Sequence, residues 1–211
     1  MTGTRARDRR PRTVRRAAGA AVAAGALVLA LAACGGGDSV DPREPAQILD
    51  PSVIATMQGD TIGTLDALAN PELVPVLAEK HLGHSPTVRR VSLYDTGFSM
   101  EVRDPVKRDN LDDYDYRYGE WSTDPVSVSV RDIEEYEKVT FTLDQVSWDV
   151  IPDLMQQAYD GLELEGEKIT SVGIDKLEGQ PPRIYMSVQG LRGSGSLFAN
   201  ADGTDVEIRR N

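Results

Sequence analysis

The only cysteine in this 211-residue chain, Cys34, directly follows an apolar run, residues 17–33, composed almost entirely of Ala, Val, Leu and Gly. A chain with a single cysteine forms no internal disulfide, so its folded part depends on the burial of apolar side chains. Residues 34–211 are enough for one sizeable hydrophobic core or for two small ones.

Residues 1–33 show the order of features that is typical of an export signal. An arginine-rich start precedes the apolar run, which is shorter and richer in small residues than a comfortable transmembrane helix of roughly 20 apolar residues. The end of the segment, Leu31-Ala32-Ala33-Cys34, resembles the bacterial lipobox. This resemblance implies cleavage between Ala33 and Cys34 and attachment of a diacylglyceryl group to the Cys34 thiol.

Two acyl chains hold a protein stably on a bilayer, at about 0.8 kcal/mol per buried CH₂. We therefore predict a lipoprotein signal peptide over 1–33 and a lipid-anchored protein on the outer, extracytoplasmic face of the cell membrane. An ordinary secretory signal beside an unrelated cysteine is the alternative. The pair Arg15-Arg16 leaves the twin-arginine export route open beside the general one.

The part that follows the leader is strongly acidic. The leader contains seven arginines and one aspartate, so residues 34–211 carry 16 basic and 33 acidic side chains, a net charge of −17. Such a charge argues against binding to nucleic acid and against direct adhesion to an anionic membrane. Residues 34–47 are rich in Gly, Pro and acidic side chains, and we expect a flexible lipidated tether there.

The remaining sequence contains similar patterns twice. Thr64-Leu65-Asp66-Ala67-Leu68 is echoed by Thr142-Leu143-Asp144-Gln145-Val146. Apolar positions then match in the same order: Val88, Val91 and Leu93 match Ile169, Val172 and Ile174, and Phe98, Met100 and Val102 match Ile184, Met186 and Val188. We predict two duplicated units, 48–138 and 139–211. The alternative is that two similar local folds acquired similar residues independently.

Each unit is predicted to contain one helix followed by four antiparallel strands. Asn70-Pro71-Glu72 begins the first helix and Gly83 ends it, while Ser147 or Asp149 begins the second and Gly161 ends it. Alternating residues indicate strands at 88–95, 98–104, 114–118 and 126–130, and at 169–177, 183–189, 196–199 and 205–209. A further helix is expected at 48–57. The predicted fold class is α+β, a tandem repeat of a helix plus a four-stranded antiparallel sheet.

Unit size and element order over residues 60–211 resemble the small secreted bacterial inhibitors of β-lactamase and the related PepSY-type modules of exported proteins. Those proteins also use tandem units in which a helix packs on an antiparallel sheet. The resemblance implies a protein-binding surface rather than an active site, and it transfers no functional residue. Those inhibitors carry disulfides, which this chain lacks the cysteines to form.

Four aromatic residues, Tyr114, Tyr116, Tyr118 and Trp121, are the candidate partner-binding residues. Tyrosine and tryptophan anchor interfaces because they bring large contact areas at small entropic cost. The alternative is that they fill the core of a chain that contains only three phenylalanines.

Candidates for metal binding and catalysis carry less weight. His81 and His84 have i,i+3 spacing, but a zinc site needs three or four protein ligands, so we expect two exposed histidines at a helix end. The cluster Asp109, Asp112, Asp113 and Asp115 does not follow the regular calcium-loop pattern and is expected in a solvated loop. Residues 190–196 are glycine-rich but match no phosphate-binding loop, and we expect a hairpin connection. We assign no catalytic residue, no metal and no cofactor.

Three functions remain open from the sequence. The first is a non-catalytic binding module, held at the membrane by its lipid anchor, that presents a sheet surface to an envelope protein. The second is a carrier of a small apolar or lipidic ligand, which requires a pocket of roughly 300–1,000 Å³. The third is an enzyme such as a hydrolase. It has only the abundance of acidic residues in its favour, and we do not expect one.

Overall fold

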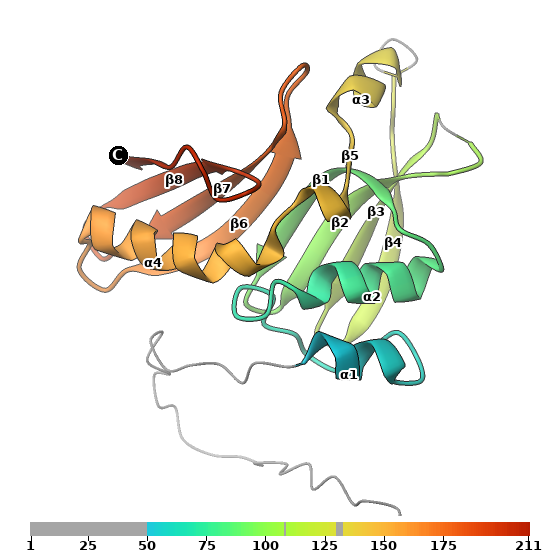
Figure 1. Cartoon of the computed structure of the whole chain (residues 1–211), viewed down its shortest axis with the longest axis horizontal. Coiled ribbons are helices and arrows are strands. Elements are labelled where there is room, and N and C mark those ends of the chain that lie inside the picture. Colours follow the sequence, from blue (N-terminus) through green and yellow to red (C-terminus); the bar gives the residue numbers. More distant parts are fainter. Residues whose placement is uncertain (1–49, 108, 130–132) are drawn as a thin grey trace, which may run out of the picture. The chain divides into compact units, whose positions relative to one another are not determined.

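Alternating apolar and polar residues produce nine strands, which form one antiparallel sheet in the part of the chain that the structure describes (Figure 1). The structure is a computed structural model that describes residues 50–107, 109–129 and 133–211. The predicted signal peptide, the predicted tether and Cys34 lie outside these described residues.

The helices and strands follow one another in two similar series. The first series is α1 (Pro51–Thr56), α2 (Leu73–Leu82), β1 (Thr87–Tyr94), β2 (Gly97–Arg103), β3 (Leu111–Arg117) and β4 (Glu120–Val126). The connection contains α3 (Ile133–Val139), β5 (Phe141–Thr142) and the 3₁₀ turns Leu143–Gln145 and Trp148–Val150. The second series is α4 (Ile151–Leu162), β6 (Lys168–Lys176), β7 (Pro182–Gln189), β8 (Ser194–Asn200) and β9 (Glu207–Arg210).

The two series share one sheet. Its strand order is β4-β3-β2-β1-β6-β7-β8-β9, and the short strand β5 pairs with β1. At the centre, β1 and β6 pair in antiparallel fashion, with Val91 opposite Ile174 and Leu93 opposite Val172. The predicted α+β class and the antiparallel pairing are thereby confirmed, whereas the prediction of a four-stranded sheet for each unit is wrong, because one nine-stranded sheet forms in the described part of the chain. Residues from both predicted units contribute to the same continuous sheet.

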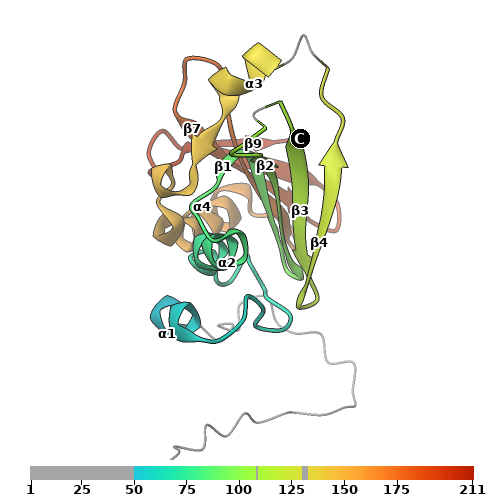
Figure 2. The ribbon, with the colours of Figure 1, turned by 90° about the vertical axis from the view of Figure 1, so that its right-hand side faces the viewer.

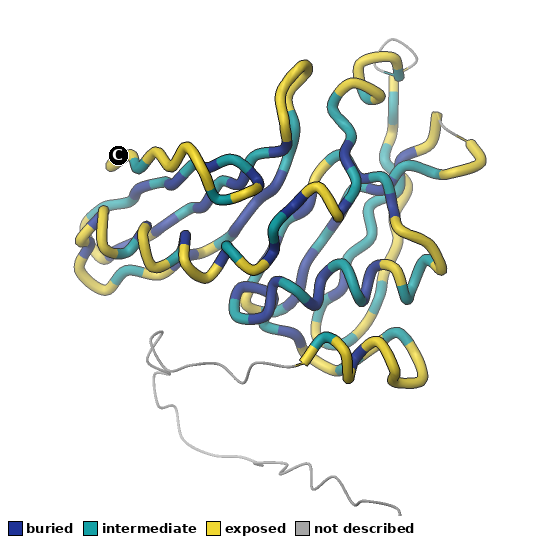
Figure 3. The backbone as a smooth tube through the Cα atoms, viewed as in Figure 1, coloured by how far each residue is buried: buried dark blue, intermediate teal, exposed yellow. Residues whose placement is uncertain are grey.

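The hydrophobic core lies between one face of this sheet and the helices. Figures 1 and 2 show α2 over β1 to β3, α4 over the strands of the second series, and α1 beside α2. Buried positions follow the strands, whereas loops and outer helix turns are exposed (Figure 3). The helices contribute Leu73, Val74, Leu77, Ile151, Leu154 and Leu162 to one continuous cluster with the strand residues. This single core supports both halves of the sheet.

The helix ends agree only in part with the expectation. As predicted, α2 ends at Gly83, which adopts the left-handed conformation with φ 72°. In contrast, α4 continues past Gly161, and Glu163 is the left-handed residue that follows it. A Cβ at Gly161 would lie 2.5 Å from Cδ1 of Ile208. Gly161 therefore permits the close approach of β9 to the helix and does not end the helix.

Two predicted segments of the first unit are wrong in detail. The fourth strand is β4, Glu120–Val126, and not residues 126–130, because Tyr118 and Gly119 form the preceding tight turn with φ angles of 52° and 86°. The predicted acidic loop is also displaced, because Asp112, Asp113 and Asp115 lie within β3. Cross-strand pairing with β2 along the whole of β3 overrides the polar composition of this segment.

Gly97 provides a test of the β2–β3 contact. It has φ 147°, and a Cβ there would lie 1.8 Å from the backbone carbonyl oxygen of Tyr116 on β3. We expect Gly97→Ala to lower the free energy of unfolding by about 3 kcal/mol, because a neighbouring strand must move. The control Gly179→Ala, which meets open space at φ 73°, should cost only about 1 kcal/mol. Urea unfolding followed by circular dichroism measures both; equal losses would contradict the assignment.

Candidate functional site

The four predicted partner-binding aromatics do not form one surface. Tyr116 is fully buried; its hydroxyl accepts from the Ile62 N–H at 2.9 Å and donates to the Gly63 carbonyl at 2.8 Å. Tyr114 and Trp121 are half-buried on the helix side of the sheet, and Tyr118 lies in the β3–β4 turn with 70% of its surface exposed. Tyr116 is therefore a core residue that no partner reaches in this structure, as the core-filling alternative predicts.

Trp121 belongs to a cluster that holds the segment 57–63 on the fold. Its indole Nε1 donates to the Asp60 carbonyl at 2.9 Å, and the His81 ring stacks on it with ring centroids 4.1 Å apart. The Nδ1 atom of His81 also contacts the Asp60 carboxylate. His81 is thus a packed, half-buried residue, and the expectation of an exposed histidine is wrong for it.

Lys80, the neighbour of His81, holds the N-terminal end of the segment 57–63. Its ammonium group donates to the carbonyl oxygens of Ile54, Ala55 and Met57 at the C-terminal end of α1. A cation at this position complements the partial negative charge of the carbonyl end of a helix. The sequence signal for this contact was weak: two basic residues in the last turn of α2, with nothing to indicate their partners.

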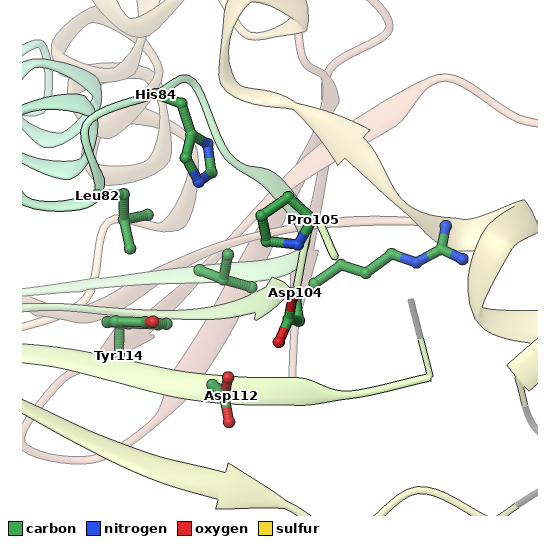
Figure 4. A pocket seen from close by; sticks show the side chains of 8 residues that line it. Leu82, His84, Asp104, Pro105, Asp112 and Tyr114 are labelled. Carbon is green, nitrogen blue, oxygen red and sulfur yellow. The ribbon is translucent and has the colours of Figure 1, made fainter. Parts of the chain in front are cut away.

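A small pocket lies beside the last turn of α2 (Figure 4). Its volume is about 150 Å³, and its lining residues are Leu82, His84, Val102, Arg103, Asp104, Pro105, Asp112 and Tyr114. His84 is exposed, as expected, and its Nδ1 lies 3.1 Å from the Ser85 carbonyl oxygen. The backbone N–H groups of Lys107 and Val106 bind the Asp104 carboxylate and lower its pKa. The pocket is below the size that small-molecule sites usually have.

Metal binding and membrane spanning find no support in the described residues. No group of three or more His, Cys, Asp or Glu side chains within residues 50–107, 109–129 and 133–211 is arranged to hold a metal ion. Within the same ranges, no helix combines the length and apolar character that crossing a bilayer requires.

The face of the sheet that points away from α1, α2 and α4 has a distinctive composition, and we call it the uncovered face (Figure 2). Its central strands β1, β2, β6, β7 and β8 present Ser92, Tyr94, Ser99, Ser171, Tyr185, Ser187, Ser196 and Phe198, all half-buried. Alternation places these side chains opposite their buried neighbours. Serines and three aromatic rings therefore share one surface, a combination that is typical of binding surfaces.

The aromatic rings of the uncovered face are held in place. Tyr185 covers Gly173, where a Cβ would lie 2.0 Å from Cζ of the tyrosine ring. The guanidinium of Arg117 lies 4.2 Å from the centre of the Tyr94 ring, and its Nε donates to Asp115 at 2.8 Å. Burial raises the pKa of the Tyr185 hydroxyl, which stays neutral at physiological pH. These contacts hold the Tyr94 and Tyr185 rings in defined positions on the uncovered face.

A row of charged residues crosses the uncovered face, and we call it the charge row. From β7 to β4 it consists of the directly opposed residues Arg183, Asp175, Arg90, Glu101, Asp113 and Asp124. The signs alternate up to Glu101, after which two further acidic residues follow. Burial, and then the charges of Glu101, Asp115 and Asp124, raise the pKa of Asp113. Like charges placed directly opposite each other destabilise a sheet, so this end of the row is unfavourable for the isolated fold.

No local sequence pattern indicates the charge row. Its members come from six strands, and their alignment depends on strand order and register. The local sequence around Asp113 indicates only an acidic cluster.

Comparison with known proteins adds little to this picture. No protein-family model matches the sequence, and no curated protein matches it. A solved structure named a "putative lipoprotein" from Clostridium difficile 630 is similar, with a TM-score of 0.45 and 11% identity over 74% of this chain and 98% of that protein. The resemblance to β-lactamase inhibitors and PepSY-type modules stays a prediction.

The contact between His81 and Asp60 predicts a response to acid. The hydrogen bond with His81 lowers the pKa of Asp60 below its usual 3.8. Its contribution to stability is therefore complete above about pH 3.8 and is lost as the pH falls through the lower folded value. Asp60→Asn should show a smaller acid-induced change in tryptophan fluorescence than the parent chain. Glu79→Gln, an exposed change on α2, is the control and should behave like the parent; equal responses in all three chains would contradict this role of Asp60.

The unfavourable end of the charge row predicts a stabilising substitution. Asp124→Lys places a cation opposite Asp113 and restores the alternation of signs, so we expect the free energy of unfolding to rise by about 0.2–1 kcal/mol. Glu165→Lys makes the same change in net charge in an exposed turn away from the row and controls for general repulsion. Urea unfolding measures the difference. A gain no larger than that of the control would show that the row carries no local repulsion.

Proposed function

We propose that this chain is a lipid-anchored, extracytoplasmic binding module without a catalytic role, and that the uncovered face is its binding surface. The observation that carries the binding role is the arrangement of fixed aromatic rings among serines on a sheet face opposite the helices. Tyrosine on such a surface supplies contact area with few rotatable bonds, and serine supplies adaptable hydrogen bonds. The proposed partner is a protein of the cell envelope.

The anchor part of the proposal rests on the leader. An arginine-rich start, an apolar run and Leu31-Ala32-Ala33-Cys34 occur in the order that a lipoprotein precursor requires. Placement outside the cytoplasmic membrane also suits an acidic domain. Repulsion between its negative charge and the anionic membrane surface keeps the domain soluble beside that surface.

The alternatives find less support in the geometry. A carrier needs room for its ligand, and the pocket beside α2 holds about 150 Å³ with several charged residues in its lining. A hydrolase would need a nucleophile or a pair of carboxylates aimed at a common point. The aspartates of the charge row lie side by side on an open face, which favours contact with a surface over catalysis in a closed site.

We also propose that the two halves arose by duplication. The matched sequence positions pair across strands in the same way: Val91 opposes Met100 as Val172 opposes Met186, and Leu93 opposes Phe98 as Ile174 opposes Ile184. The strand register shifts at Val88/Arg90 in β1 and at Ile169/Ser171 in β6, 81 positions apart in each case. Bulges are specific features of a strand, so a shared bulge supports common descent more strongly than shared apolar residues do.

The anchor is tested by replacing its attachment point. Cys34→Ser should move the protein from the membrane fraction to the soluble fraction of cells that export it, and should abolish incorporation of an alkyne-labelled fatty acid. Ser39→Ala, five residues further along, is the matched control and should keep both properties. Labelling and sedimentation that persist in Cys34→Ser would refute the proposed anchor.

A further inference from the structure

We propose that the uncovered face binds a basic protein partner, with lysine or arginine side chains of the partner placed against the acidic end of the charge row. This inference rests on the proposed binding function and names the chemistry of its partner. It follows from three observations: the directly opposed acidic pair Asp113 and Asp124, the aromatic rings on the same face, and the net charge of the domain.

Within the described residues, the acidic end of the charge row, Asp113 and Asp124, has no ion-pair partner, whereas Glu101 is paired with Arg89. Among the described residues, Arg117 is engaged with Asp115 and the Tyr94 ring, and Arg89 contacts Glu101. No ion pair within the described ranges reaches Asp113 or Asp124, which lie directly opposite each other on β3 and β4. A cation supplied by a partner would continue the alternation of signs that the row shows from Arg183 to Glu101. Charge complementarity of this kind speeds association and selects the partner.

Small side chains connect the Tyr185 ring with the acidic strand β3 across the uncovered face. Ser92 and Ser99 oppose each other on β1 and β2, and the next residue in the same register on β3 is Asp115. On the other side of Ser92, Tyr185 covers Gly173, which is the residue opposite Ser92 on β6. A partner that covers the Tyr185 ring therefore also reaches the acidic strands through a surface of small side chains. Aromatic centres with a polar, charged border are typical of protein interfaces.

Other occupants fit this surface less well. Nucleic acid and anionic lipid carry the same sign of charge as the acidic run and would be repelled. A second copy of this chain would bring its own net charge of −17, counted for residues 34–211, against the first. A basic segment of another protein removes the repulsion between Asp113, Asp124 and Glu101 and gains contact with the rings.

The test is photo-crosslinking of the full-length chain in its native cells. A photoreactive benzoylphenylalanine replaces Ser99 on the uncovered face or, as the positional control, exposed Gln157 on α4. Each chain is prepared with its native acids, with Asp113→Asn and Asp124→Asn together, or with Asp160→Asn and Glu165→Gln together. The last pair makes the same change in net charge on the helix side of the fold. Lipid labelling of Cys34 is followed in the same cells.

We expect a protein adduct from position 99 and not from position 157. The crosslinked peptide of the partner should contain lysine or arginine with a net positive charge. The yield should fall about tenfold with the Asp113/Asp124 pair and stay unchanged with the Asp160/Glu165 pair, as a loss of matched charges at the contact requires. Folding of both pairs is checked by circular dichroism, and the first pair should be at least as stable as the parent because it removes repulsion.

Several results would overturn the inference. These are an absence of any adduct at position 99, an adduct whose yield ignores the Asp113/Asp124 pair, an acidic partner peptide, an adduct with a second copy of this chain, and an adduct with residues 34–49 of the same chain. An adduct from position 157 alone would overturn the inference and the choice of the uncovered face as the binding surface, while a binding role on the helix side would remain. Loss of lipid labelling at Cys34 would instead refute the anchor, whatever the crosslink shows.

Discussion

The pairing of β1 with β6 is the contact on which the rest of this fold depends. Val91 and Leu93 of β1 meet Ile174 and Val172 of β6, and all four are fully buried. Without these backbone hydrogen bonds each four-stranded half would present an unprotected edge in the middle of the molecule. With them, the halves share one hydrophobic core, and the helices can lie on one side while the opposite side stays continuous across eight strands.

The same pairing creates the binding surface that we propose. Arg90 of β1 is opposite Asp175 of β6 and also opposite Glu101 of β2, so the charges of the two halves join into one row only because the central strands are in this register. A shift by one residue between β1 and β6 would turn the row members, serines and tyrosines of one half toward the core side. Buried Val91 and Ile174 oppose such a shift, so the core determines which residues the uncovered face displays.

Much of the fold could be predicted from local patterns. Seven of the eight long strands overlap the segments that period-two alternation predicts, although β3 begins three residues earlier, and Gly83 ends α2 as its position predicts. The fourth strand was misplaced because the turn uses Tyr118, a residue seldom found at positive φ, and because Pro125 lies inside an edge strand. The candidate site is harder to predict from the sequence than the fold. His81, Trp121 and Asp60 are far apart in the sequence and meet only through tertiary packing, and the charge row requires the register of six strands.

The cluster around Asp60 also affects how the domain responds to a mechanical force applied at its N-terminal side. If the anchor pulls on residues that precede Asp50, the load enters through α1, which contributes only Ile54 to the core. Lys80 grips the last carbonyls of α1, and Trp121, Tyr116 and His81 hold the segment behind it. These bonds lie between Asp50 and the sheet, so they carry a force that is applied at the N-terminal side of α1. A force applied through residues that precede Asp50 would therefore load these bonds before it loads the pairing of the strands.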